Sequence, residues 1–182
     1  MSKVFTVVSG KGGVGKSTFC ANVAISLAEQ NKKVLLIDGD AGLRSLDLLL
    51  SVDSMVVYDW LDIIESRCDH NKARLFFNDN LQLLPAPITC PDSLTKEIFM
   101  DMIGKFREEY DYIIIDCMPS LGMMTINALS CADTVLIPVQ AAYLPVKGLQ
   151  QLIATIGKIR RQLNRKLQIE GILLTMVDMR TN

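Results

Sequence analysis

The chain has 182 residues, of which 49% are hydrophobic and 21% are charged. This length and balance favour one folded domain and exclude a disordered or fibrous chain. The formal net charge is −1, so the overall charge attracts neither nucleic acid nor acidic lipid, and any such contact must be local.

The five cysteines are odd in number and form no C-x-x-C pair. They are therefore expected to be reduced thiols of a cytosolic protein. No apolar run reaches the roughly eighteen residues that span a bilayer, and the chain does not start with a secretory signal pattern. Together these observations predict a cytoplasmic protein.

Apolar segments of strand length alternate with helical patterns along the chain. We expect strands at 4–8, 34–37, 81–84, 112–115, 134–139 and 169–176, and helices at 17–30, 94–106 and 146–163, with a short helix within 57–64. This order predicts an α/β fold of three layers, in which helices cover both faces of a mostly parallel central sheet. Ligands of such sheets bind at the carboxyl ends of the strands.

A phosphate-binding pattern follows the first predicted strand. Residues 10–18 fit G-x-x-x-x-G-K-[ST], a loop whose backbone N–H groups wrap the phosphates of a nucleotide. Lys16 would bring a positive charge to the β- and γ-phosphates, and the Ser17 hydroxyl would ligate Mg²⁺. Lys11 is an additional lysine that the plain pattern does not require. The predicted nucleotide-binding residues are Gly10, Lys11, Gly12, Gly13, Val14, Gly15, Lys16, Ser17 and Thr18.

Three aspartates follow predicted strands at the same edge of the sheet. Asp116 ends an apolar run and is typical of a residue that holds Mg²⁺ through water. Asp38 and Asp40 follow another apolar run, and in an extended chain their side chains point the same way. One of the pair can then face the metal while the other orients a water. A turn or helix cap at Asp116, and a polar turn at 38–40, are the alternatives.

Other motifs are less decisive. No N-K-x-D run, the usual guanine reader, occurs in the chain, which favours ATP over GTP. The run 158–166 places five cations near the end of the last long helix. They either complement the helix dipole on a solvated surface or contact phosphates without reading a base sequence. Met118, Met123 and Met124 leave a similar choice between a partner surface and packing at a helix start.

The segment 11–18 resembles the deviant Walker A loop of the ParA and MinD ATPases, and the resemblance covers essentially the whole chain. It implies a P-loop NTPase fold, ATP and Mg²⁺ as cofactors, and a homodimer when ATP is bound. In that family the early lysine, here Lys11, reaches across the dimer to the partner's phosphates.

The resemblance also assigns roles to the aspartates. It implies that Asp40 orients the attacking water, that Asp38 is its companion near the metal, and that Asp116 is the Walker B residue. The predicted catalytic residues are Lys11, Lys16 and Asp40, and the predicted metal residues are Ser17, Asp38 and Asp116.

Two branches of the family are similar to different parts of the chain. Segments 37–47, 57–68 and 83–87 resemble MinD, the division-site positioning ATPase, whereas 115–122, 138–149 and 171–182 resemble the ParA proteins of plasmids and mobile elements. A natural mosaic or an engineered fusion would each produce this pattern. Since relatives continue further, residues 1–182 are expected to form a single P-loop ATPase domain that lacks their C-terminal segment.

Three functions are therefore open. The first is a ParA-type ATPase of DNA partitioning, which would bind non-specific DNA and an activating partner protein. The second is a MinD-type positioning ATPase that binds membrane, which the absence of an amphipathic C-terminal helix disfavours. The third is a nucleotide-gated scaffold that does not hydrolyse ATP. The absence of a C-x-x-C pair argues against the relatives that carry an iron–sulfur cluster.

Overall fold

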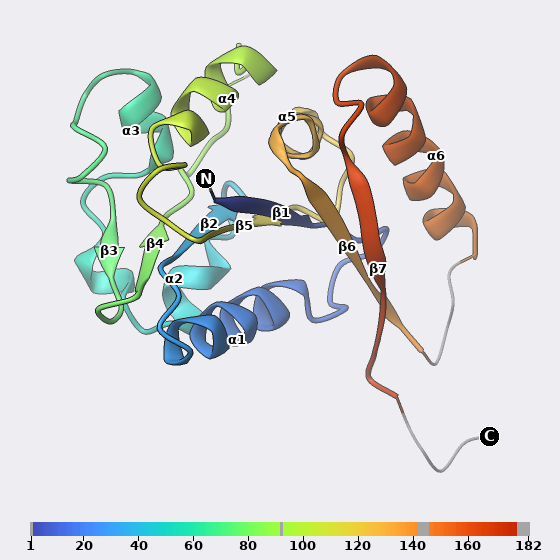
Figure 1. Ribbon diagram of the computed structural model, residues 1–182, viewed down its shortest axis with the longest axis horizontal. Coiled ribbons are helices and arrows are strands. Elements are labelled where there is room, and N and C mark those ends of the chain that lie inside the picture. Colours follow the sequence, from blue (N-terminus) through green and yellow to red (C-terminus); the bar gives the residue numbers. More distant parts are fainter. Residues whose placement is uncertain (1, 92, 142–145, 178–182) are drawn as a thin grey trace.

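The computed structural model describes residues 2–91, 93–141 and 146–177. Seven strands form one sheet in the order β3-β4-β2-β5-β1-β6-β7 (Figure 1). Neighbouring strands are parallel except for β3 and β4, which are antiparallel. The strands are β1 (Lys3–Val7), β2 (Val34–Gly39), β3 (Leu75–Phe76), β4 (Leu81–Leu84), β5 (Tyr112–Cys117), β6 (Thr134–Gln140) and β7 (Gln168–Thr175).

Helices cover both faces of this sheet, which confirms the predicted three-layer α/β fold (Figure 1). One face carries α1 (Lys16–Glu29) and α2 (Ser45–Leu49), and a short 3₁₀ helix, η1 (Asp53–Met55), follows α2. The opposite face carries α3 (Trp60–Ile64), α4 (Lys96–Gly104), α5 (Met123–Cys131) and α6 (Val146–Gln162). None of the helices within the described ranges is long and apolar enough to cross a bilayer.

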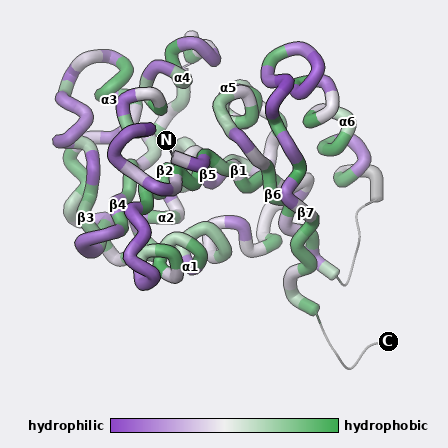
Figure 2. The backbone as a smooth tube through the Cα atoms, in the orientation of Figure 1, coloured by the Kyte–Doolittle hydropathy of each residue, from purple (hydrophilic) through white to green (hydrophobic). Residues whose placement is uncertain are grey.

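The central strands are buried on both faces, as their continuous apolar runs predict. All six residues of β2 are buried, and their side chains alternate between two hydrophobic cores. Leu35 and Ile37 join the core under α3 to α6, whereas Val34 and Leu36 join the core under α1 and α2. Apolar colouring in Figure 2 accordingly follows the strands at the centre of the molecule.

Trp60 anchors the end of β2, where two of the predicted site residues lie. Its indole Nε1 donates a hydrogen bond of 2.9 Å to the backbone carbonyl of Asp38. The ring is fully buried and meets Phe99 edge to face, with 6.0 Å between ring centroids. Asp59 starts α3 just before it, because its carboxylate accepts hydrogen bonds from the N–H groups of Leu61 and Asp62.

The structure contains every strand and helix predicted from the sequence, with ends that differ by a few residues. The short helix within 57–64 begins at Trp60, and the strand expected at 169–176 runs from Gln168 to Thr175. Four elements were not predicted: α2, η1, β3 and α5. Because α5 begins at Met123, with Met124 buried, packing at a helix start accounts for Met124, while Met123 remains half exposed.

Candidate nucleotide site

The phosphate loop connects β1 to α1 at the carboxyl edge of the sheet. Gly13 and Gly15 have φ angles of 73° and 85°, a left-handed conformation that favours glycine. Gly15 directly precedes α1, and its carbonyl accepts the first helical hydrogen bond, from the Phe19 N–H at 2.9 Å. The N–H groups at the start of α1 are thus directed into the loop, which is the arrangement that binds phosphate.

Two distant elements hold this loop in place. The Thr175 hydroxyl, at the end of β7, donates a hydrogen bond of 2.9 Å to the carbonyl of Val14. Gly10 lies against the backbone of Gly148 in α6, so closely that a Cβ on Gly10 would be 3.0 Å from the carbonyl carbon and oxygen of Gly148. The position of the phosphate loop is therefore tied to the packing of α6 and β7.

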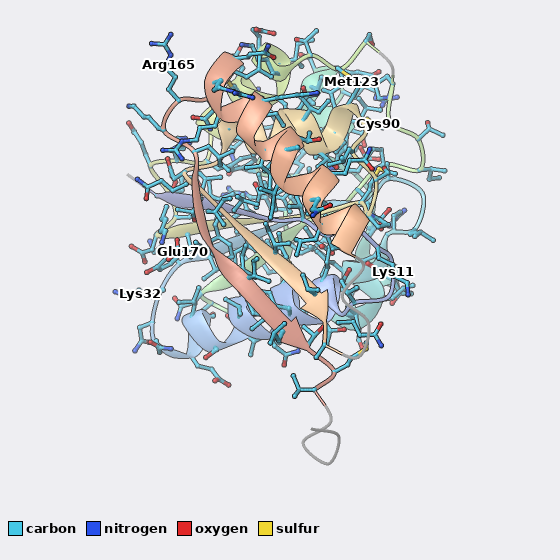
Figure 3. All side chains as sticks on the ribbon, turned by 90° about the vertical axis from the view of Figure 1, so that its right-hand side faces the viewer. Lys11, Lys32, Cys90, Met123, Arg165 and Glu170 are labelled. Atoms are coloured by element: carbon cyan, nitrogen blue, oxygen red, sulfur yellow. The ribbon has the colours of Figure 1, made fainter. Side chains whose placement is uncertain are left out.

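The two lysines of the loop face different surroundings. Lys16 is buried, with 7% of its surface exposed, and its charge reaches both Asp40 and Asp116. Lys11 is exposed, and Figure 3 shows it at the surface near the N-terminal end of α6. Lys16 thus belongs to the interior of its own site, whereas Lys11 is available to a group outside this chain.

Asp38 and Asp116 lie side by side on neighbouring strands. They are register partners in the parallel pair of β2 and β5, and they are 1% and 0% exposed. One oxygen of Asp38 accepts a hydrogen bond of 2.9 Å from the Asp40 N–H, and the other accepts one of 3.0 Å from the Leu46 N–H. Asp38 therefore holds both the backbone of Asp40 and the first turn of α2.

Burial raises the pKa of the Asp38 carboxyl to about 7. The neighbouring carboxylates of Asp116 and Asp40 also raise this pKa, whereas the two backbone hydrogen bonds lower it. Burial likewise raises the pKa of Asp40, although the charge of Lys16 opposes this. The charges of three buried carboxyl groups and one buried lysine thus act on one another, a pattern typical of functional sites.

Asp116 is the residue that most clearly lacks a partner. Both of its carboxylate oxygens are fully buried and accept no hydrogen bond of normal geometry from a described residue. Burial raises its pKa, while the nearby Ser17 hydroxyl, the Lys16 charge and the Cys20 thiol favour the charged form. A buried carboxylate without a partner is costly, and a hydrated cation beside Ser17 would satisfy it.

Mg²⁺ suits this set of residues better than a metal held by protein ligands alone. The described residues contain no group of three or more histidines, cysteines or acidic residues that could hold a metal ion. Mg²⁺ characteristically takes one or two protein oxygens and completes its shell with phosphate oxygens and water. Ser17 and Asp116 fit that mode, whereas both oxygens of Asp38 already accept backbone hydrogen bonds. Direct ligation by Asp38 stays a prediction.

Ser45 is a site residue that the sequence analysis missed. Its hydroxyl, at the start of α2, donates a hydrogen bond of 3.1 Å to the Ser17 hydroxyl. The sequence offered no specific signal for this contact, since Ser45 matches no nucleotide-binding pattern and α2 was not predicted. Ser45 extends the phosphate site to a second element of the fold.

The structure divides the predicted nucleotide-binding residues between two adjoining hollows. An open groove towards α2 is lined by Gly13, Gly15, Lys16, Ser17 and Thr18, together with Leu43, Ser45, Leu48, Leu49 and Met176. A smaller cavity towards α6 is lined by Gly10, Lys11 and Val14, together with Pro138, Val139, Gln140 and Leu149. Gly12 lines neither of them, and a Cβ on Gly12 would lie 3.7 Å from the Pro119 side chain.

These features define a class of protein, the P-loop nucleotide-binding proteins, in which a phosphate loop joins the first strand and first helix of a parallel sheet. Comparison with known proteins narrows the class. Residues 2–169 match a protein family described as an AAA domain. The chain is 39% identical over 193 residues to the sporulation initiation inhibitor protein Soj of Bacillus subtilis, an alignment that covers 100% of this chain and 76% of Soj.

Two further relatives represent both branches. The chromosome partitioning protein ParA of Myxococcus xanthus is 37% identical over 194 residues, which cover 100% of this chain and 68% of that protein. The septum site-determining protein MinD of Bacillus subtilis is 37% identical over 141 residues, which cover 75% of this chain and 53% of MinD. The chain belongs to the ParA/MinD family of P-loop ATPases. The assignment of its two halves to different branches stays a prediction.

A solved structure adds information on ligands. Cobyrinic acid a,c-diamide synthase of Mycobacterium smegmatis, with bound ADP and magnesium, matches with a TM-score of 0.89 and 29% identity. The match covers 100% of this chain and 77% of the synthase. The family fold thus accommodates an adenine nucleotide and Mg²⁺ together.

Proposed function

We propose that the protein is a Mg²⁺-dependent ATPase that acts as an ATP-switched homodimer in DNA partitioning. The observation that carries the proposal is the buried carboxylate of Asp116, which lacks a hydrogen-bond partner beside the hydroxyl and lysine of a phosphate loop. Relatives named for chromosome partitioning support the biological role.

Each predicted residue has a task in ATP hydrolysis. Lys16 and the N–H groups of the loop neutralise the β- and γ-phosphates, and Ser17 and Asp116 hold the metal. A Mg²⁺ ion held there would supply positive charge against the negative charge that develops on the phosphate oxygens. Asp40 orients the attacking water from the end of β2, where Asp38 holds its backbone.

The proposed dimer brings a second lysine to each site. Lys11 is exposed on its own chain, so it can approach the phosphates bound by another copy. A cation placed there would stabilise the negative charge of the transition state, as an arginine finger does in related reactions. ATP binding and dimer formation would then depend on each other.

A MinD-type role at a membrane is the second candidate, because the MinD relative is also 37% identical over three quarters of the chain. The two roles separate in a direct assay. The protein would be incubated with ATP or ADP and tested for binding to random-sequence duplex DNA and to anionic vesicles. ATP-dependent binding to DNA would support the partitioning role. ATP-dependent binding to vesicles, without binding to DNA, would contradict that role and support the MinD-type role.

The catalytic part of the proposal is tested by phosphate release with and without Mg²⁺. We expect Lys16→Ala to reduce kcat/KM by roughly 10²-fold or more, while Lys32→Ala, an exposed lysine after α1, leaves it unchanged. Asp40→Ala should still bind ATP and dimerise but stop hydrolysis. If the wild-type protein binds ATP without releasing phosphate, it is a nucleotide-gated scaffold and not an ATPase.

A further inference from the structure

The link between Asp40 and α2 contains a residue in an unusual backbone conformation. Arg44 directly precedes α2 and has φ and ψ angles of 48° and 54°, in the left-handed region that residues other than glycine rarely adopt. Gly42, two residues earlier, is also left-handed, with a φ angle of 94°. Glycine takes this conformation without strain, whereas arginine takes it only where contacts hold it there.

Contacts hold Arg44 through both its backbone and its side chain. Its N–H donates a hydrogen bond of 3.1 Å to the carbonyl of Asp40. Its guanidinium donates from Nε and Nη2 to one carboxylate oxygen of Asp47, at 3.1 and 2.7 Å. The other oxygen of Asp47 accepts a hydrogen bond of 2.8 Å from the Leu48 N–H. Arg44 therefore joins the residue proposed to orient the water to the middle of α2.

The Arg44–Asp47 pair is better shielded from water than the other ion pairs of the described residues. Its two side chains are 26% and 4% exposed. In each of the other pairs at least one side chain is more than a third exposed. Water and salt weaken a shielded pair less, so this pair holds its geometry more firmly than a surface pair does.

The helix that this pair supports is too short to be stable alone. α2 has five residues, and no side chain caps its N-terminus. An isolated helix of this length does not persist in water, so the position of α2 depends on tertiary contacts. Leu46 supplies buried apolar packing, and the Arg44–Asp47 pair supplies a polar contact at the first turn.

The two residues after Arg44 connect this turn to the metal side of the site. The Ser45 hydroxyl donates to Ser17, and the Leu46 N–H donates to Asp38. A displacement of the turn would therefore move the hydroxyl that is predicted to ligate Mg²⁺. In an enzyme site, a misplacement of about 1 Å can lower the rate by roughly 10²-fold.

We infer that Arg44 is a positioning residue for ATP hydrolysis. Through Asp47 it fixes the first turn of α2, and thereby the residues on the metal side of the site. Through its own N–H it fixes the backbone of Asp40 on the water side. Arg44 touches no reacting atom itself. The inference deepens the proposed function and rests on it.

The experiment separates positioning from folding with three variants and a control. Arg44→Ala removes the guanidinium, whereas Arg44→Lys keeps the positive charge and loses the planar fork. Asp47→Asn removes the charge of the partner. Arg67→Ala is the control, because it breaks an exposed ion pair with Asp62, outside the site.

Each variant is measured in three ways, at a temperature far below its thermal midpoint. Phosphate release gives kcat and KM, and ATP titration in EDTA gives the nucleotide affinity without metal. Electron paramagnetic resonance of Mn²⁺ gives the metal affinity in the presence of a non-hydrolysable ATP analogue.

We expect Arg44→Ala to lower kcat by roughly 10- to 100-fold and to weaken Mn²⁺ binding several-fold, with little change in KM or in ATP affinity in EDTA. Arg44→Lys should fall between Arg44→Ala and the wild type, and Arg67→Ala should match the wild type. Because the two partners act as a unit, Arg44→Ala combined with Asp47→Asn should lose no more activity than the more damaging single variant.

Other outcomes would overturn the inference. Unchanged kcat and Mn²⁺ affinity in Arg44→Ala, with only a lower thermal midpoint, would make the pair purely structural. Additive losses in the double variant would mean that Arg44 acts without Asp47. If the wild type binds ATP but releases no phosphate, the proposed function fails, and the Mn²⁺ measurements still decide whether Arg44 positions the metal residues.

Discussion

The hydroxyl of Ser45 is hydrogen-bonded to the hydroxyl of Ser17 at 3.1 Å, and this bond joins α2 to the phosphate loop. The next residue, Leu46, donates its N–H to Asp38. The first turn of α2 is thus connected both to Ser17, a predicted metal ligand, and to Asp38 of β2, whose carboxylate also holds the Asp40 N–H. A small helix that the sequence did not predict therefore organises three predicted site residues.

Ser45→Ala should raise the Mg²⁺ concentration needed for half-maximal ATPase activity by a few-fold, because Ser17 loses the donor that orients its oxygen. ATP binding measured in EDTA should change little. Ser26→Ala, an exposed serine of α1, is the control. A Mg²⁺ dependence unchanged by Ser45→Ala would show that the bond does not position Ser17.

Lys11→Ala should bind ATP with nearly the affinity of the wild type, since its own site retains Lys16 and the loop N–H groups. The variant should lose the ATP-bound dimer and hydrolysis, because the exposed Lys11 is proposed to act in the partner's site. Nucleotide titration and analytical ultracentrifugation check the two parts separately. Loss of ATP affinity with a normal dimer would place Lys11 in its own site instead.

Asp116→Asn should reduce the rate of Mg²⁺-dependent hydrolysis by roughly 10²-fold or more. It should also stabilise the protein in the absence of nucleotide. The second effect follows because Asp116 is fully buried and both of its oxygens lack a hydrogen-bond partner among the described residues. Thermal unfolding at pH 8 without Mg²⁺ measures the gain. A lower midpoint than that of the wild type would mean that the carboxylate is already compensated in the free protein.

The nucleotide-free protein should become less stable as the pH rises from 4 to 8. Burial, with help from Asp116 and Asp40, raises the pKa of Asp38 from 3.8 to about 7. The folded state therefore retains a proton that the unfolded chain releases, so this contribution is complete below pH 4 and is lost as the pH passes 7.

The change in the free energy of unfolding from Asp38 is at most about 4 kcal/mol. Urea unfolding at several pH values measures this change. In Asp38→Asn the free energy of unfolding should depend less on pH than in the wild type, whatever the stability of the variant at any one pH. An equal dependence in both proteins would assign the effect to other groups.

The sequence predicts the central strands well because each is an unbroken apolar run that is buried on both faces. It fails for α5 for a related reason. Residues 124, 125 and 127–131 are all buried, so α5 has no polar face and no helical alternation for a pattern to reveal. The two-residue strand β3 is too short to produce a signal.

The candidate site also contains residues that the sequence predicts and residues that it does not. The phosphate loop is local in sequence, so its pattern was visible and its residues lie together. By contrast, Ser45 contacts Ser17, which is 28 residues away in the chain. The N–H of Leu46, at the start of α2, contacts Asp38, which is 8 residues away. No local pattern encodes those contacts, because serine at a loop end is common. Asp38 was predicted to lie near the metal, and its hold on two backbone N–H groups emerged only from the fold.

The contact between Gly10 and Gly148 requires glycine at position 10 of the phosphate loop for packing alone, and position 12 has no such requirement. A side chain at position 10 would collide with the α6 backbone even in a protein that never meets a nucleotide, whereas one at position 12 would meet only Pro119, at ordinary contact distance. In a library of variants selected for folding alone, glycine should therefore persist at position 10 and be replaced at position 12. Selection for ATP turnover should restore it at both.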